Sequence, residues 1–235
     1  MSEYAVRITR LNYAYPDGTK ALEAIDLDVR AGERMAIVGP SGAGKSTLLL
    51  HLNGVLTGAG TVRILGRTMD AKNLREIRRQ VGVVFPDPND QLFCPTVYED
   101  VAFGPLNLSV PQGEIPQRVE RALKDAGLDQ SIRNRSSHHL SLGERKRVAL
   151  ATVLSMEPTI LALDEPTSNL DPRNRRHLIE LIAGLPATLI IATHDLELVL
   201  ALCPRTVLMD RGKIWADGET RALMRDAALM ETHGL

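Results

Sequence analysis

The segment from Gly39 to Thr47 combines closely spaced glycines with a lysine and hydroxyl side chains. It fits the pattern G-x-x-x-x-G-K-[ST] at every fixed position. Glycines let successive backbone N–H groups wrap closely around an anion, and the positive end of a following helix adds to the attraction. We therefore predict a nucleotide phosphate site formed by Gly39, Pro40, Ser41, Gly42, Ala43, Gly44, Lys45, Ser46 and Thr47.

Two side chains of this segment carry specific chemistry. Lys45 can reach the β- and γ-phosphates as a point charge, and Ser46 offers a hydroxyl oxygen to Mg²⁺. The alternative is a glycine-rich turn that matches by chance. An apolar run at 35–38 before the segment predicts a strand, and the residues 45–54 predict a helix. This strand–loop–helix context favours the phosphate site.

An acidic pair, Asp164 and Glu165, ends a second apolar stretch that predicts a strand at 159–164. Ligands of open parallel sheets bind at the carboxyl ends of the strands. At such a place Asp164 can hold a water bound to Mg²⁺, and Glu165 can act as the general base for an attacking water. A plain pair of strand-end carboxylates is the alternative, and the presence of the phosphate-binding pattern in the same chain argues against it.

Ser141 and Glu144 have the S-x-x-E spacing of a helix capping box. The structural interpretation is a well-made start of a helix at 144–156. The functional interpretation uses the same helix terminus as a second anion site.

Length and composition describe an ordinary globular protein without a strong electrostatic partner. The chain has 235 residues, 44% hydrophobic and 24% charged, with a formal net charge of −1. No long basic run is present, so nucleic acid is not expected as a partner. Cys94 and Cys203 are too few for a disulfide framework and fit a reducing cytoplasm. The opening residues lack the apolar core of a secretory signal, and we expect no stretch that spans a bilayer.

Alternating strand and helix patterns predict an α/β fold with a parallel sheet covered on both faces. Strands are expected at 5–12, 26–30, 34–38, 61–65, 81–85, 159–164, 187–193, 205–210 and 213–217. Helices are expected at 45–54, 73–79, 96–103, 115–126, 144–156, 172–183 and 195–202, and the residues after 217 suffice for one more. We expect one domain over 1–235, with a nucleotide-binding core at 1–86 and 145–235 and an inserted helical lobe at 87–144.

Taken together, these motifs resemble the ATP-binding-cassette ATPases over nearly the whole chain. Walker A is 39–47, the signature loop is 140–144 and Walker B is 160–165. Residues 169–171 resemble the D-loop, and His194 resembles the switch histidine. The resemblance implies a P-loop NTPase (RecA-like) core with a parallel sheet, an antiparallel β edge subdomain and the inserted helical lobe.

The same resemblance implies roles for further residues. Two copies would dimerise head to tail, so that Ser141 and Gly143 of one cover the γ-phosphate bound by the other. His194 would contact the γ-phosphate, and Tyr15 would stack on the adenine. Asp171 before Pro172 also has a purely structural interpretation as a helix cap. The adjacent His138 and His139 are interpreted as a solvated turn.

A narrower resemblance is to the energy-coupling-factor importers, particularly their cobalt and nickel branch. The residues 13–22, 87–93, 96–107 and 163–172 carry it. In that family the ATPases drive a membrane scaffold, so the residues Gln91 to Phe103 would line the docking groove for membrane subunits. Leu92, Phe93, Val97 and Phe103 can alternatively be core residues.

Two positions depart from the family pattern. Pro86 stands where glutamine is usual, and proline has no side-chain amide to reach Mg²⁺ or water. Either Gln91 or a neighbour takes over as a metal ligand, or activity waits on a partner. In the signature loop, Leu142 and Glu144 replace the common glycine and glutamine, while Ser141 and Gly143 are kept.

The resulting expectation is an ATP-binding and ATP-hydrolysing subunit, with ATP and Mg²⁺ as its ligands. It would work as a homodimer or heterodimer, peripheral to the cytoplasmic face of the membrane, in a coupling-factor importer for cobalt or nickel ions. The alternatives are a vitamin importer of the same type, a non-hydrolysing nucleotide sensor or assembly module, and a cassette protein that acts on DNA or ribosomes.

Overall fold

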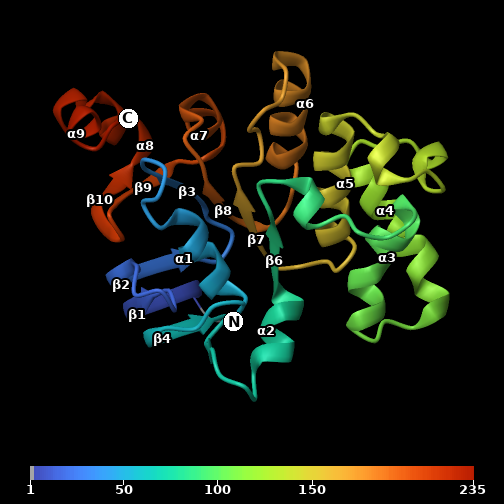
Figure 1. Ribbon diagram of the computed structural model, residues 1–235, viewed down its shortest axis with the longest axis horizontal. Helices are drawn as coiled ribbons and strands as arrows, with labels where there is room; N and C mark the ends of the chain where they lie inside the picture. Colours follow the sequence, from blue (N-terminus) through green and yellow to red (C-terminus); the bar gives the residue numbers. More distant parts are fainter. Residues whose placement is uncertain (1–2) are drawn as a thin grey trace. The chain divides into compact units, whose positions relative to one another are not determined.

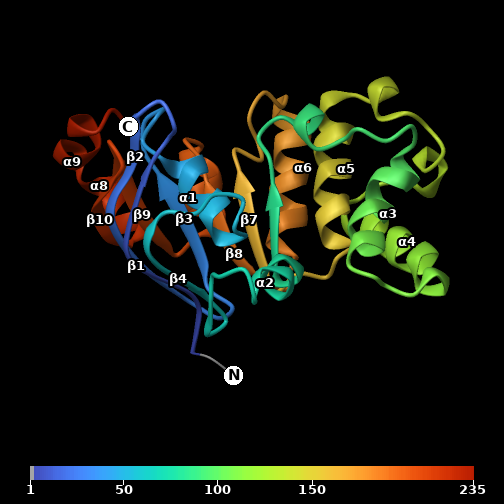
Figure 2. The ribbon, with the colours of Figure 1, turned by 60° about the horizontal axis from the view of Figure 1, so that its bottom comes forward.

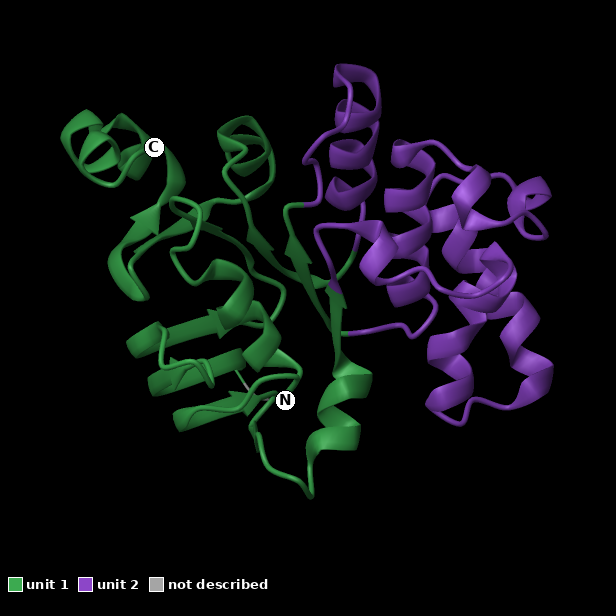
Figure 3. Cartoon of the chain, viewed as in Figure 1, with its two compact units in different colours: residues 1–83, 159–165, 186–235 green, residues 84–158, 166–185 purple. Residues whose placement is uncertain are grey.

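The computed structural model describes residues 3–235, so Met1 and Ser2 of the opening segment lie outside the described residues. The chain divides into two compact units (Figure 3), each built from separate stretches of sequence. Unit 1 comprises Met1–Val83, Thr159–Glu165 and Pro186–Leu235, and unit 2 comprises Val84–Pro158 and Pro166–Leu185.

A six-stranded sheet with the order β10-β9-β3-β8-β7-β6 forms the centre of unit 1, apart from the last residue of β6. Its strands are β3 (Arg34–Val38), β6 (Val81–Val84), β7 (Ile160–Asp164), β8 (Thr188–Ala192), β9 (Arg205–Asp210) and β10 (Lys213–Glu219). β3 is parallel to β8 and β9, and β7 is parallel to β8, whereas β10 is antiparallel to β9. Every residue of β7 and β8 is buried, as expected of a sheet covered on both faces. Figures 1 and 2 show β3, β8 and β7 side by side.

A second, antiparallel sheet has the order β2-β1-β4-β5. Its strands are β1 (Tyr4–Ala14), β2 (Lys20–Arg30), β4 (Ala59–Ile64) and β5 (Arg67–Thr68). The strand predicted at 61–65 pairs here with β1. The predicted antiparallel edge subdomain is therefore confirmed.

The helices of unit 1 follow its strands in the chain. They are α1 (Lys45–Leu52), α2 (Leu74–Gln80), α7 (Leu196–Leu202), α8 (Thr220–Arg225) and α9 (Ala227–Thr232). The single helix expected after the last strand is wrong, because α8 and α9 are separate. Asp226 leaves the helical conformation between them, and its side chain accepts a hydrogen bond from Leu229 N at 3.0 Å, which starts α9.

Unit 2 is helical. Its α-helices are α3 (Val97–Asn107), α4 (Ile115–Asp125), α5 (Leu142–Leu154) and α6 (Pro172–Ala183). Capping boxes begin α3, at Thr96 and Glu99, and α5, at Ser141 and Glu144. Each satisfies backbone N–H groups that the first turn leaves without an intrahelical partner.

The division into units differs from the predicted lobe at 87–144. Helices α5 and α6, expected in the core, belong to unit 2. α5 packs against α3 and α4, and Ser155 at its end donates a hydrogen bond to Val101 O on α3 at 2.8 Å. Side-chain burial against the other helices therefore determines where α5 belongs.

Within residues 3–235, none of the helices combines the length and apolar character needed to cross a membrane.

Candidate active site

The parallel sheet of unit 1 brings three predicted site segments to one edge. β3 leads into Gly39, β7 into Glu165, and β8, which lies between them, into Thr193 and His194. The backbone hydrogen bonds between neighbouring strands continue past the strand ends. Thr193 N donates to Ile37 O at 3.0 Å, and Glu165 N donates to Ala192 O at 2.8 Å. The carboxyl ends of adjacent parallel strands thus form one site, as in other open sheets.

The backbone of the phosphate-binding segment requires glycine at two positions. Gly39 has a φ of 151°, and a Cβ there would lie 1.9 Å from Met209 O. Gly44 has a φ of 100°, and a Cβ would lie 2.5 Å from Ala21 O. Both are conformations that glycine adopts without strain. The close packing of neighbouring backbone against this loop therefore shapes it before any anion binds.

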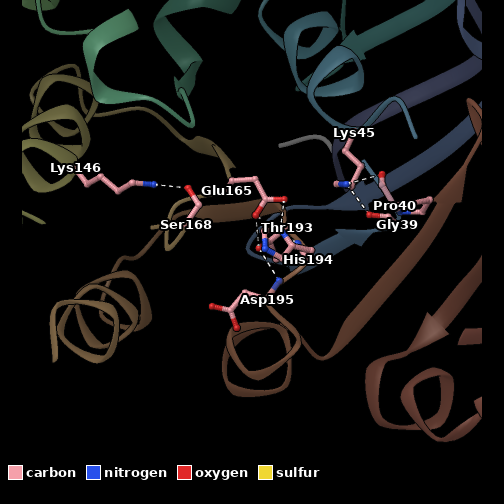
Figure 4. A network of polar contacts seen from close by, with 9 residues as sticks. All are labelled: Gly39, Pro40, Lys45, Lys146, Glu165, Ser168, Thr193, His194 and Asp195. Atoms are coloured by element: carbon pink, nitrogen blue, oxygen red, sulfur yellow. Dashed lines mark hydrogen bonds and ion pairs between the residues drawn. The ribbon is translucent and has the colours of Figure 1, made fainter. Parts of the chain in front are cut away.

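Lys45 is folded back onto its own loop (Figure 4). Its ammonium donates to Gly39 O at 2.6 Å and to Pro40 O at 3.0 Å. Burial lowers the pKa of Lys45, and the negative charges of Glu165 and Asp164 oppose that shift. The ammonium is held by two neutral carbonyl oxygens. Negatively charged phosphate oxygens could replace them and would add a Coulomb attraction.

The oxygen atoms needed for Mg²⁺ are present at the same edge. Ser46, in the first turn of α1, is exposed, whereas Asp164, at the end of β7, is 5% exposed. A hydroxyl and a carboxylate are hard oxygen donors of the kind that Mg²⁺ prefers. These residues fit the ion, which would neutralise phosphate charge when bound.

Glu165 is held by the loop that follows β8 (Figure 4). Its Oε2 accepts from Thr193 Oγ1 at 2.9 Å and from His194 N at 3.4 Å, and its Oε1 lies 2.9 Å from His194 Nδ1. The side chain of Glu165 is 19% exposed and that of His194 is 68% exposed. A partly buried carboxylate next to an accessible imidazole can accept a proton from water.

Thr193 was not singled out from the sequence, although its hydroxyl fixes one oxygen of Glu165. It also accepts a hydrogen bond from Asp195 N at 3.0 Å, and Asp195 caps α7 by accepting from Leu198 N at 3.1 Å. A threonine before histidine at a strand end is the signal that points to this role.

Tyr15 lies against the first turn of α1. Its hydroxyl is 2.8 Å from Thr47 Oγ1, and its ring packs edge-on against Tyr13 at a centroid distance of 5.1 Å. Tyr13 in turn packs edge-on against His51 of α1 at 4.9 Å. The predicted adenine-stacking side chain therefore stands beside the phosphate-binding segment and is partly exposed.

The signature loop lies in unit 2. Ser141 Oγ donates to Glu144 Oε2 at 2.7 Å, and this bond and the one from Ser141 N lower the pKa of Glu144. Gly143 is packed so closely that a Cβ would lie 2.7 Å from the Asn174 side chain. Asn174 is itself held by Asp171, which caps α6. The capping interpretation of both motifs is confirmed, and their contact with nucleotide stays a prediction.

Lys146, one turn into α5, is a buried residue that sequence reasoning missed. Its ammonium donates to Ser168 Oγ at 2.8 Å (Figure 4). This bond joins α5, the helix that follows the signature loop and is called the signature helix below, to the segment before Asp171 within unit 2. A lysine between two arginines on a predicted helix looks like a solvated face, so only the packing identifies this contact.

The carboxamide of Gln91 forms hydrogen bonds to other residues of unit 2. Its Oε1 accepts from Phe85 N at 3.1 Å, and its Nε2 donates to Ala149 O and to Thr152 Oγ1, both at 2.7 Å. The suggested role as a metal ligand would compete with these bonds. The geometry favours a structural role, fixing the loop that contains the exposed Pro86.

The predicted docking residues divide into two groups. Leu92 and Val97 are 4% and 0% exposed and belong to the core. Phe93 and Phe103 are 64% and 47% exposed, and their rings pack edge-on at 4.9 Å. The two rings therefore form a small exposed apolar patch, and contiguous apolar patches are a feature of binding surfaces.

Comparison with protein families and curated sequences gives consistent matches. A family model for ABC transporters matches residues 22–168. A protein of Streptomyces coelicolor named as an ABC transporter ATP-binding protein is 53% identical, over 97% of this chain and 88% of its own. The energy-coupling factor transporter ATP-binding protein of Methanothermobacter thermautotrophicus is 45% identical, over 98% and 76%. The cobalt import ATP-binding protein of Rhodobacter capsulatus is 46% identical, over 96% and 82%.

Solved structures share the fold. CbiO1 of Clostridium perfringens, a part of the ABC transporter complex CbiONQ, is 38% identical. It has a TM-score of 0.85, with 98% of this chain and 94% of that chain covered. An ATP-binding cassette crystallised as a dimer with ADP and phosphate is 27% identical. It has a TM-score of 0.81 and coverages of 92% and 99%.

Proposed function

Because the chain belongs to the ABC transporter family and is an ATPase whose hydrolysis is coupled to transport, we propose that it powers an energy-coupling-factor importer for cobalt or nickel ions. The observation that carries the enzymatic part is the common sheet edge where the Lys45 loop, Asp164, Glu165 and His194 meet.

Each residue of that edge has a proposed task. Lys45 and the backbone N–H groups of 39–47 bind the phosphates, and Ser46 with Asp164 would hold Mg²⁺, the latter through water. Glu165 accepts a proton from the attacking water, and Thr193 and His194 orient its carboxylate. His194 also contacts the γ-phosphate, and Tyr15 stacks on the adenine.

The proposed working unit is a dimer in which Ser141 and Gly143 of one chain complete the ATP site of the other. The dimeric cassette bound to ADP and phosphate, which shares the fold, supports a dimer as the working unit. The N-terminus of α5 supports it physically, because a helix N-terminus attracts phosphate. The partner chain can be a second copy or a related ATPase.

The proposed contact with the membrane is through other subunits that dock near Gln91 to Phe103, at the cytoplasmic face. The exposed pair Phe93 and Phe103 supports a docking surface in this stretch. The cargo is inferred from the cobalt import protein of Rhodobacter capsulatus, since the cargo itself would contact the membrane partners.

The test begins with turnover of Mg-ATP by the purified chain as a function of its concentration. We expect turnover to rise faster than linearly, because each site is completed by a second chain. Mixing two inactive variants, Lys45→Ala and Ser141→Arg, should restore part of the activity, since one of the two sites in the mixed dimer is intact. His138→Ala, a change at an exposed position, is the control.

Turnover that is strictly linear in concentration, with no recovery on mixing, would refute the shared site. Nucleotide binding without turnover under every condition would favour the sensor alternative. The cargo is tested separately, by copurifying the membrane subunits and measuring uptake of Co²⁺, Ni²⁺ and vitamins in vesicles. Uptake of a vitamin alone would overturn the cobalt or nickel assignment.

A further inference from the structure

The turn between β9 and β10 is packed against the phosphate-binding loop. Gly212 N donates to Ala43 O at 3.0 Å, and Gly212 O accepts from Glu23 N at 2.8 Å. Gly212 is buried, and a Cβ there would lie 2.8 Å from Ala21 O. The turn therefore fills the space between β2 and the loop, so its position affects the loop directly.

The same turn is held from the other side by α9 and β10. His233, at the end of α9, has Nδ1 3.0 Å from Asp210 Oδ2, and Trp215 Nε1 donates to Asp210 O at 3.1 Å. The rings of Trp215 and His233 lie 4.9 Å apart. Asp210 is thus fixed through both its side chain and its backbone.

Burial makes the contact between His233 and Asp210 consequential. The side chains are 6% and 16% exposed, respectively. An ionised carboxylate has no proton to donate, so Nδ1 of His233 is the donor in this hydrogen bond. Removing this donor would leave a largely buried carboxylate with a hydrogen bond lost, and Asp210 would move toward water.

We propose that His233 and Trp215 are positioning residues of the phosphate-binding loop, acting through Asp210 and Gly212. Phosphate is recognised there by backbone N–H groups, whose directions depend on the course of the loop. A shift of the turn changes the hydrogen bond at Ala43 and the packing against Gly39, whose neighbour is Met209 O. The inference rests on the proposed function, because it assumes that this loop binds nucleotide.

The first test measures ADP binding by isothermal titration calorimetry. His233→Leu should weaken ADP binding by between about threefold and tenfold. This range corresponds to the loss of one hydrogen bond to a charged group, of which only a part reaches the phosphate-binding loop. His233→Asn keeps an N–H donor near the place of Nδ1 and should recover most of the affinity. Glu231→Gln, exposed on the same helix, is the matched control and should bind as the wild type does.

A second readout follows from the sequence, in which Trp215 is the only tryptophan. Indole emission depends on the hydrogen bond of its N–H and on the ring stacked beside it. ADP should therefore change the intrinsic fluorescence of the wild type saturably, and Lys45→Ala should lose the response at the same ADP concentrations. Trp215→Phe removes the hydrogen bond to Asp210 O, and its affinity is measured with a fluorescent ADP analogue. Because Trp215 is 55% exposed, this substitution should disturb folding little.

The outcomes separate this inference from the proposed function. Wild-type protein that binds no ADP would overturn the proposed function and this inference with it. A second outcome is that the wild type binds ADP, that His233→Leu and Trp215→Phe bind it equally well, and that Trp215 emission does not respond. This outcome would overturn the inference alone. Weaker binding that His233→Asn restores, at equal melting temperature, supports it.

Discussion

Replacing Gln91 with leucine should destabilise the protein without changing its affinity for Mg²⁺. The substitution removes the bonds to Phe85 N, Ala149 O and Thr152 Oγ1. Three hydrogen bonds at about 1 kcal/mol each give about 3 kcal/mol. Gln91 is only partly buried, so water can replace some of these hydrogen bonds in the variant. We therefore expect the free energy of unfolding to fall by about 1–2 kcal/mol.

The measurement is thermal unfolding followed by circular dichroism. For a chain of this size, each kcal/mol shifts the melting temperature by about 2–4 °C, so a decrease of about 2–8 °C is expected. Gln91→Glu keeps an acceptor for Phe85 N but turns an oxygen toward Ala149 O, and should also destabilise. Gln112→Leu makes the same change at an exposed position and serves as the control.

If Gln91 were a metal ligand, the same substitution would have a different effect. In that case Gln91→Leu would weaken the Mg²⁺ dependence of ATP binding and leave the melting temperature near that of Gln112→Leu. Such a result would refute the structural role. A lowered melting temperature with unchanged Mg²⁺ dependence would rule out the ligand role.

Three further predictions concern Glu165, Pro86 and the signature loop. Glu165→Gln should lower turnover about 10²-fold or more, as for loss of a general base, with ATP affinity retained; a variant that hydrolyses normally would exclude that role. Pro86→Gln should raise turnover if this position limits hydrolysis, and unchanged steady-state rates would show that it does not. Ser141→Ala should raise the pKa of Glu144 toward its ordinary value and cost about 1 kcal/mol of cap stability, measured by NMR titration and by melting. The pKa of Glu144 is lowered in the folded state, so its contribution is present above its unfolded pKa and is lost as pH falls through the folded pKa. The wild type should lose that increment on acidification. Ser141→Ala should lose a smaller one, because the backbone N–H at position 141 and the nearby arginines still lower the pKa of Glu144.

The phosphate-binding segment was predictable because its chemistry is local. A tight loop around an anion needs glycine at specific positions, and the observed φ angles of Gly39 and Gly44 are of that kind. The capping residues Ser141 and Asp171 were predictable for the same reason, since a cap bonds to backbone a few residues ahead. Each of these features is set within a short stretch of sequence.

Contacts between distant parts of the chain were not predictable in this way. Glu165 meets Thr193 because β7 and β8 are neighbours in a particular register, with Asp164 opposite Ala192. Neither the strand order nor the register is visible in the residues of one strand. The unit boundary was missed for the same reason, because α5 has a helical pattern wherever it packs.

The loop after Phe85 contains Pro86 at the position where the family usually has glutamine, and the surrounding side chains keep this loop in place. Pro86 has no backbone N–H and no side-chain amide. The Gln91 carboxamide bonds instead to Phe85 N, just before the proline, and to α5. Asn89 adds a second tie to α5, since its Oδ1 accepts from Arg145 Nη1 at 2.8 Å. Because both bonds lie within unit 2, the loop should move with the signature helix. Pro86 therefore changes what the loop can offer to a metal ion while its attachment to α5 is kept by side chains farther along the loop.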